Sequence, residues 1–202
     1  AVAGNPNIEF ILTAEVATIW SQAGKLRRMH TLLVAPNLEA VQRLNDRLSQ
    51  VGKLRSDGRP VLGMSARSLA ELAWSIDEQF LVIPAHAWTP WFAVFGSMSG
   101  FDSLEECYGD VADRIFAIET GHSSDPAMNW RVSALDAVAL ISSSDAHSVQ
   151  NLGREATIFS VNSRADLTFP LIAQMIREAS PKWRRQHLPH TPGVWGRCLK
   201  GT

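Results

Sequence analysis

Carboxylates and imidazoles follow several apolar runs of this sequence, at the positions where predicted β-strands end. These residues are Glu15, His86, Glu119, His122, Asp145 and His147. In the stretch 138–154 an apolar run passes into serines and then into Asp145 and His147, which are two residues apart and point the same way if the strand continues. The carboxyl ends of strands share one face in a β/α barrel, so such side chains converge without being near in sequence. We therefore expect a functional site at that face.

The residue types in this set suit a metal centre. Three histidines (His30, His86 and His147) accompany two carboxylates (Glu15 and Asp145). Zinc and manganese accept mixed imidazole and carboxylate ligands, and a carboxylate can bridge two ions. Two or more neighbouring ions suit phosphoester hydrolysis, in which one activates water and another stabilises the departing oxygen. The residues favour a phosphoesterase.

Other interpretations of the same residues stay open. A single histidine after a strand is more often structural than a metal ligand, and Glu119 and His122 fit supporting or plain loop roles equally well. A Ser-His-Asp hydrolase is a weaker alternative, because the sequence has no G-x-S-x-G elbow and the serines at 142–144 lie beside an acid.

The elements that must position these residues alternate between strand and helix. Apolar runs predict strands over residues 8–14, 31–35, 80–83, 114–118 and 138–141. Helical spacing predicts helices over 38–49 after the cap Asn37, around Leu69 to Ile76 after Ser65 or Ser68, and over 103–107 and 169–179. This order is typical of an α/β fold. Residues 180–202, which are basic and lack periodicity, are expected to form an irregular tail.

Composition places the chain among ordinary globular proteins. It has 202 residues, 46% of them hydrophobic, and a formal net charge of −1. We expect a cytoplasmic protein with no membrane partner, since no run is long enough to span a bilayer and no signal peptide is evident. The two cysteines, Cys107 and Cys198, are far apart and predict neither a disulfide framework nor a thiolate zinc site.

Aromatic and basic residues offer a second kind of chemistry. The long loop 87–102 contains Trp88, Trp91, Phe92 and Phe95, which form either a hydrophobic lid or a surface that stacks beside an extruded base. The basic residues before it are Lys25, Arg27, Arg28, Lys53, Arg55 and Arg59. They are phosphate contacts on one interpretation and solvated loop charges on the other.

Five segments resemble a known family. They are P-A-H-A-W-T-P-W-F (84–92), F-G-S-M-S-G-F-D-S-L-E-E-C (95–107), E-T-G-H-S-S-D-P-A-M-N-W-R (119–131), S-D-A-H-S (144–148) and N-L-G-R-E-A (151–156). Together they closely resemble endonuclease Q and its bacterial relatives, which belong to the PHP (polymerase and histidinol phosphatase) superfamily of metal-dependent phosphoesterases. The likeness covers roughly residues 8–159. It implies a distorted (β/α)7 barrel over 1–179 with up to three zinc, manganese or magnesium ions.

The resemblance also implies roles for residues. Glu15 resembles the carboxylate that bridges two ions, and His30 and His86 resemble the imidazoles that complete the second. Asp145 resembles a ligand of the first ion and His147 a ligand of the third. The implied catalytic residues are Glu15, His86 and Asp145. The implied contacts to a flipped base or its strand are Ser123, Ser143, Trp88 and Asn129. The implied reaction cuts DNA 5′ of uracil, hypoxanthine or an abasic site, alongside replication or repair proteins.

Some features depart from the family pattern. The chain begins after the place of the family's N-terminal H-x-H pair, so we expect a truncated barrel that lacks its first units. Where the family commonly has Asn, Ser143 would shorten a contact to the base. Only Cys198 stands where relatives carry cysteines for a structural zinc. A phosphatase of a small phosphorylated metabolite and an inactive DNA-binding remnant of the fold are the alternatives.

Overall fold

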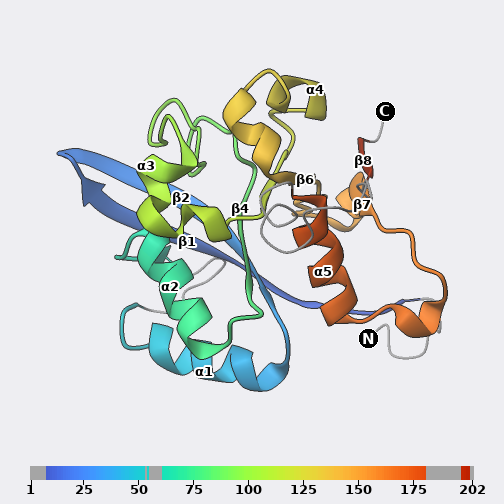
Figure 1. The fold of residues 1–202 in the computed structure, drawn as a ribbon. Coiled ribbons are helices and arrows are strands. Elements are labelled where there is room, and N and C mark those ends of the chain that lie inside the picture. The colour runs from blue at the N-terminus through green and yellow to red at the C-terminus, as the bar shows by residue number, and fades with distance from the viewer. Residues whose placement is uncertain (1–7, 53, 55–60, 181–196, 201–202) are drawn as a thin grey trace.

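A long β-hairpin runs through the centre of the molecule (Figure 1). The computed structural model describes residues 8–52, 54, 61–180 and 197–200. Strands β1 (Leu12–Gln22) and β2 (Lys25–Ala35) pair antiparallel over their whole length. The two residues between them, Ala23 and Gly24, both have positive φ (48° and 74°), as a tight two-residue hairpin turn requires. The prediction of strands over 8–14 and 31–35 was therefore wrong in extent, and the basic residues Lys25, Arg27 and Arg28 lie within β2.

Further strands extend this sheet on both sides. Strand β3 (Val61–Leu62) lies parallel to β1, and β4 (Leu81–Pro84) pairs antiparallel with β2, giving the order β3-β1-β2-β4. The short strands β5 (Ala117–Glu119) and β6 (Ala139–Ile141) form a parallel pair. The Ala87 N–H donates to the Glu119 carbonyl over 2.9 Å, which ties the pair to the segment after β4.

A third sheet lies at the C-terminal end of the chain. It consists of β7 (Glu155–Ile158), paired antiparallel with β8 (Arg197–Lys200). The rest of the segment expected as a tail, 181–196 and 201–202, is outside the described residues.

Five α-helices flank these sheets in the described part of the chain. They are α1 (Leu38–Leu48), α2 (Ala66–Ile76), α3 (Leu104–Tyr108), α4 (Pro126–Asn129) and α5 (Phe169–Ala179). The predicted caps are confirmed, because Asn37 accepts from the Ala40 N–H over 2.8 Å and Ser65 from the Ser68 N–H over 3.0 Å. Short 3₁₀ turns cover Gly109–Arg114, Ser133–Ala137, Val149–Asn151 and Arg164–Asp166. None of the described helices has the length and apolar character needed to cross a bilayer.

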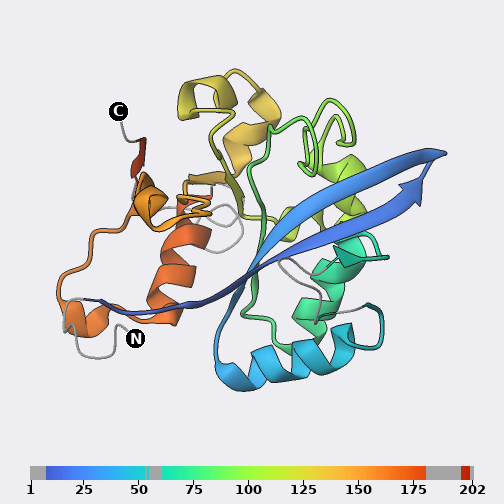
Figure 2. The ribbon, with the colours of Figure 1, turned by 180° about the vertical axis from the view of Figure 1, so that it is seen from behind.

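The mixed α/β class is confirmed, but the barrel is not. The described strands form one four-stranded and two two-stranded sheets, and they close no barrel. The physical reason is the hairpin: a β/α barrel is built from parallel strands joined through helices, whereas β1 turns directly into β2 and β2 pairs antiparallel with β4. Figure 2 shows α1 and α2 on one side of the hairpin and α5 toward the other end of the sheet.

Two apolar clusters hold the site-bearing segments in place. The larger joins the hairpin to α1, α2 and α3 and includes the fully buried Met29, Leu69 and Tyr108. The smaller packs α5 against β4, β5 and β6 through residues such as Ile83 and Ile176. The first residues after β4, β5 and β6 are thus fixed by strands whose side chains are buried on both faces in β4 and β5 and mostly buried in β6.

Candidate metal centre

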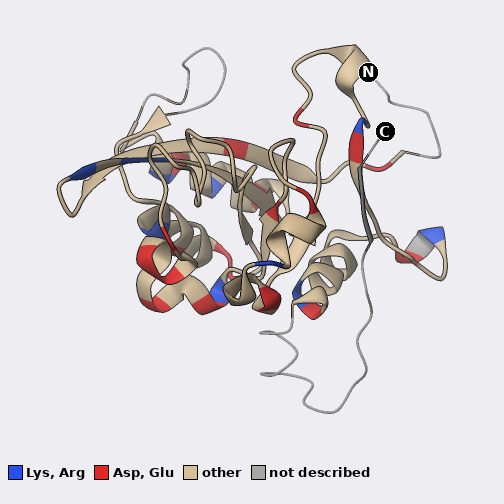
Figure 3. Ribbon diagram, turned by 90° about the horizontal axis from the view of Figure 1, so that it is seen from above, with Lys and Arg blue, Asp and Glu red and all other residues tan. Residues whose placement is uncertain are grey.

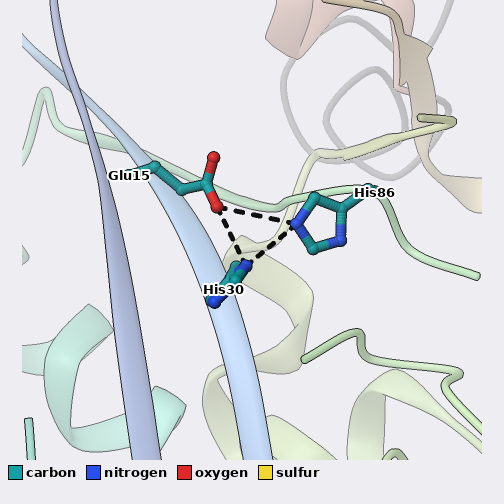
Figure 4. Close-up of side chains that lie close together, drawn as sticks. All are labelled: Glu15, His30 and His86. Atoms are coloured by element: carbon teal, nitrogen blue, oxygen red, sulfur yellow. Dashed lines mark hydrogen bonds and ion pairs between the residues drawn. The ribbon is translucent and has the colours of Figure 1, made fainter. Parts of the chain in front are cut away.

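Glu15, His30 and His86 meet at one point between β1, β2 and the end of β4 (Figure 4). The His30 Nδ1 atom lies 3.0 Å from Glu15 Oε1 and 3.0 Å from His86 Nε2. The third side of the triangle, from His86 Nε2 to Glu15 Oε1, measures 3.5 Å. The two histidines are buried and Glu15 is half-buried.

The hairpin register brings the first two residues together. Glu15 pairs with Leu32 and Ala17 pairs with His30, so Glu15 and His30 are diagonal neighbours on one face of the hairpin. Diagonal side chains in an antiparallel pair are within reach of each other when they are long. Glu15 is the fourth residue of β1, so the prediction that a strand ends at Glu15 was wrong.

His86 reaches the same point through an unusual backbone conformation. It follows β4 with φ at 30°, a region that bulky residues seldom adopt. Its N–H donates to the buried Glu119 carboxylate (Oε2) over 2.8 Å, and the preceding Ala85 N–H donates to the His30 carbonyl over 3.1 Å. Gly121 packs against it so closely that an added Cβ would lie 2.5 Å from the His86 Cβ. Strained backbone of this kind persists where its surroundings hold it, and it gathers at functional sites.

The triangle fits a divalent ion. Ligand atoms about 2.0–2.2 Å from an ion such as zinc, at angles of about 90–109°, lie about 2.8–3.6 Å apart. The three measured separations, 3.0, 3.0 and 3.5 Å, fall within that range. Two imidazoles and a carboxylate are also the donors that zinc and manganese accept. This group could hold a metal ion, as the sequence predicted for these three residues.

Neighbouring side chains orient the two imidazoles. The second ring nitrogen of His86, Nδ1, lies 2.9 Å from the Thr89 hydroxyl, which itself donates to the Trp91 carbonyl over 2.9 Å. The Phe92 ring stacks on the His30 ring with centroids 4.4 Å apart. Partners of this kind fix the tautomer and the ring orientation of metal-binding histidines. Sequence reasoning gave Thr89 no role.

The surroundings of His86 and Glu119 raise the pKa values of both residues. Burial lowers the pKa of His86, but the hydrogen bond to Glu15 and the charges of Glu15 and Glu119 outweigh it, so that its pKa is raised overall. Burial raises the pKa of Glu119, and hydrogen bonds from Ser143 and from the His86 N–H offset only part of that rise. His86 therefore holds its proton to higher pH than a free imidazole does, and a metal ion that binds there would have to displace that proton.

Asp145 and His147 lie apart from the triangle, on the loop after β6, and belong to no group of three metal-ligating side chains among the described residues. Asp145 has φ at 44°, and its side chain lies 3.7 Å from the ring of His147 (Oδ1 to Nδ1). The side chain of His147 is 73% exposed. Arg154 donates to the Ser144 carbonyl over 2.7 Å and to the Asp145 carbonyl over 3.2 Å, which fastens this loop to the start of β7.

A polar network centred on the buried Glu155 holds the same loop in place. Glu155 accepts a 2.5 Å hydrogen bond from the Ser142 hydroxyl and pairs over 3.0 Å with His122. His122 also contacts the Ser144 carbonyl at 3.3 Å. Glu155 was outside the predicted set of site residues, because the strand β7 that it opens was not predicted either.

The four predicted substrate contacts have different settings. Ser143 hydrogen-bonds Glu119, the carboxylate that also accepts from the His86 N–H, whereas Ser123 is on the exposed surface. Trp88 donates its indole N–H to Asn129 over 2.8 Å. Asn129 is fully buried, and its amide N–H groups donate to Ser124 Oγ and to a backbone carbonyl. Trp88 and Asn129 thus brace α4 against the aromatic loop, and their contact with a substrate stays a prediction.

Comparison with known proteins places this geometry in context. No protein-family model matches the sequence. The crystal structure of the lesion-specific endonuclease PfuEndoQ from Pyrococcus furiosus matches over 85% of this chain with a TM-score of 0.70 and 33% identity. A structure of endonuclease Q bound to a 27-mer duplex with an abasic lesion at the active site matches over 85% of the chain, with a TM-score of 0.72 and 35% identity. The chain has an endonuclease Q-like fold.

This likeness covers part of the larger proteins. The chain spans 40% of each endonuclease Q structure. The uncharacterized protein YqxK of Bacillus subtilis (strain 168) is 30% identical over 145 residues, which are 69% of this chain and 35% of that protein. The predicted resemblance to endonuclease Q is confirmed at the level of the fold.

Proposed function

We propose that this chain provides the metal-binding part of a DNA endonuclease that acts on damaged DNA. The observation that carries the proposal is the convergence of Glu15, His30 and His86 within a fold shared with lesion-specific endonucleases. The proposed reaction cuts one strand 5′ of a deaminated base, such as uracil or hypoxanthine, or of an abasic site. The duplex bound in the related structure carries an abasic lesion, which supports this substrate class.

The proposed cofactor is a divalent ion, and Glu15, His30 and His86 would hold it. Zinc, manganese and magnesium are the candidates. When bound, such an ion supplies Lewis-acid activation of water and of a phosphoryl oxygen. We further propose that the chain is a PHP-type phosphodiesterase. Asp145 and His147 would then be ligands of further ions, up to three ions in all.

The chain's own residues have separable tasks in this proposal. The Thr89 hydroxyl holds His86 in the tautomer that presents Nε2 to the triangle. Phe92 covers one face of His30 and excludes water there. The hydroxyl of Ser143, which hydrogen-bonds the Glu119 carboxylate beside His86, is a candidate contact for a base that leaves the stack.

A strand-nicking assay tests the proposal. End-labelled duplexes that contain uracil, hypoxanthine, an abasic site or no lesion are incubated with the protein and Mn²⁺. We expect a nick 5′ of the lesion, none in the undamaged duplex, and loss of the nick in Glu15→Gln and His86→Gln. The matched control is Glu39→Gln, an exposed glutamate in the first turn of α1.

Two outcomes contradict the proposal. Binding of the damaged duplex without any nick, over a range of divalent ions, indicates a non-catalytic DNA-binding protein. Hydrolysis of a small phosphate monoester in the absence of nicking indicates a phosphatase.

A further inference from the structure

Arg28 lies on the same strand face as the metal-binding His30, two residues before it in β2. Its guanidinium carbon is 5.0 Å from the centre of the Trp91 ring and 5.9 Å from that of Phe92. The Phe92 ring in turn stacks on His30. A continuous row of rings and one guanidinium thus leads from the triangle outward along the hairpin.

The charge of Arg28 has no carboxylate partner among the described residues, and its buried Nε atom has no hydrogen-bond partner there. Its neighbour Arg27 differs: it pairs with Glu106 over 2.8 Å and lies over the Phe101 ring. Arg67 likewise pairs with acids of its own surface. A half-buried guanidinium that is held between aromatic rings and lacks an acid is suited to an external anion.

The loop that carries the rings is held firmly against β2. Phe92 has φ at 58°, an outlier for an aromatic residue, and its carbonyl accepts from the His30 N–H over 2.9 Å. Ser99 donates from its hydroxyl to the Arg28 carbonyl over 3.4 Å. The strained turn presents Trp91, which is 46% exposed and lines a groove of about 650 Å³.

The groove carries three basic side chains, Lys25, Arg27 and Arg28, and two acidic ones, Asp102 and Glu106, of which Glu106 pairs with Arg27. Lys25 and Arg28 line it on the hairpin side, and Trp91, Ser97 and Met98 line it on the loop side. Figure 3 shows Lys and Arg residues, drawn in blue, near the tip of the hairpin, where β2 begins. Positive charge interleaved with exposed aromatic surface is the pattern by which proteins bind single-stranded nucleic acid.

We propose that Arg28 and Trp91 form a clamp for the DNA strand that enters the metal centre, and this inference rests on the proposed function. Arg28 binds a phosphate that neighbours the one at the Glu15, His30 and His86 triangle, and Trp91 stacks against the unpaired nucleotide beside it. The spacing is suitable, because two residues along a strand advance about 6.6 Å, which is comparable to the distance between successive phosphates of one DNA strand.

The test compares Arg28→Gln, Arg28→Lys and Trp91→Ala with Arg43→Gln, an exposed arginine of α1 that provides the matched loss of charge. Fluorescence anisotropy measures binding of an abasic duplex at several salt concentrations, with Ca²⁺ present. We expect Arg28→Gln to bind about 10-fold more weakly and the slope of log K against log salt to become shallower by about 0.7–0.9. Arg28→Lys retains the parent slope, and Trp91→Ala binds at least about 5-fold more weakly at every salt concentration.

Equilibrium dialysis of Mn²⁺ separates the clamp from the metal centre. All four variants are expected to retain the parent's metal stoichiometry, since none of these residues is a ligand. The inference is overturned if Arg28→Gln changes affinity and salt slope no more than Arg43→Gln does, or if its metal content falls. If the parent never nicks DNA but its salt dependence of binding becomes shallower in Arg28→Gln, the endonuclease is refuted and the clamp is supported. If the parent nicks DNA and the Arg28→Gln variant nicks it with the same KM, the clamp is refuted and the endonuclease is not.

Discussion

Replacing Gly121 with alanine tests how closely the backbone approaches His86, a candidate metal ligand. Gly121 has φ at 59°, and an added Cβ would lie 2.5 Å from the Cβ and 2.8 Å from the Cα of His86. The left-handed conformation costs a non-glycine residue about 1–2 kcal/mol. Overpacking against the fixed backbone of His86 adds about 1–3 kcal/mol. We expect the free energy of unfolding to fall by about 2–5 kcal/mol, and His86 to leave the triangle.

Gly24→Ala is the matched control for this variant. Gly24 has a similar φ of 74°, but an added Cβ would meet nothing within 4 Å. It therefore carries the conformational cost alone. Each kcal/mol corresponds to about 2–4 °C in Tm for a domain of about 150–250 residues. Thermal unfolding of both variants and calorimetric titration with Mn²⁺ give the comparison. Equal Tm values, with parent-like metal affinity in Gly121→Ala, would refute the reasoning.

Three further predictions concern the surroundings of the triangle. Thr89→Val should weaken Mn²⁺ binding about 10–100-fold by releasing the second nitrogen of His86, with near-parental affinity in Thr89→Ser, as measured by titration. Unchanged affinity in Thr89→Val would remove Thr89 from the site. Glu155→Ala should lower the free energy of unfolding by about 1–3 kcal/mol in urea melts, because it leaves Ser142 and His122 without their buried partner. A parental midpoint would show that the network contributes nothing. Mn²⁺ affinity should fall as pH decreases through the raised pKa of His86, because the imidazole must lose its proton to bind and holds it to higher pH than a free histidine. A pH-independent affinity between pH 5 and 8, the range of about ±1.5 around the histidine value of about 6.5, would contradict that assignment.

Helices and caps were the most predictable part of this fold. The spacing of apolar residues gave α5 with its observed bounds and α1 within one residue, since each helix is an amphipathic stretch that begins at a polar cap. The hairpin was missed because its turn is Ala23-Gly24 rather than a dipeptide such as Asn-Gly. Hydrophobic runs alone could not show that β1 continues past Glu15. Because the hairpin was missed, the strands were expected to alternate with helices, and the family resemblance added the expectation of a barrel.

The candidate site was predictable only in part. Residue types and the family resemblance singled out Glu15, His30 and His86, and the structure brings these three together. Thr89 and the stacking of Phe92 depend on positive φ values at His86 and Phe92, which local sequence does not reveal. Such conformations are set by long-range packing, so they appear only in the folded chain.

Metal stoichiometry of the purified protein tests the central claim most directly. The protein is dialysed against Mn²⁺ or Zn²⁺ and its metal content per chain is measured, beside Glu15→Gln, His30→Gln and the matched control Glu39→Gln. The account predicts at least one ion per chain in the parent and the control, and the loss of one ion in each ligand variant. A parent that binds no ion, or ligand variants that keep the parent's full content, would contradict the assignment of this triangle as a metal centre.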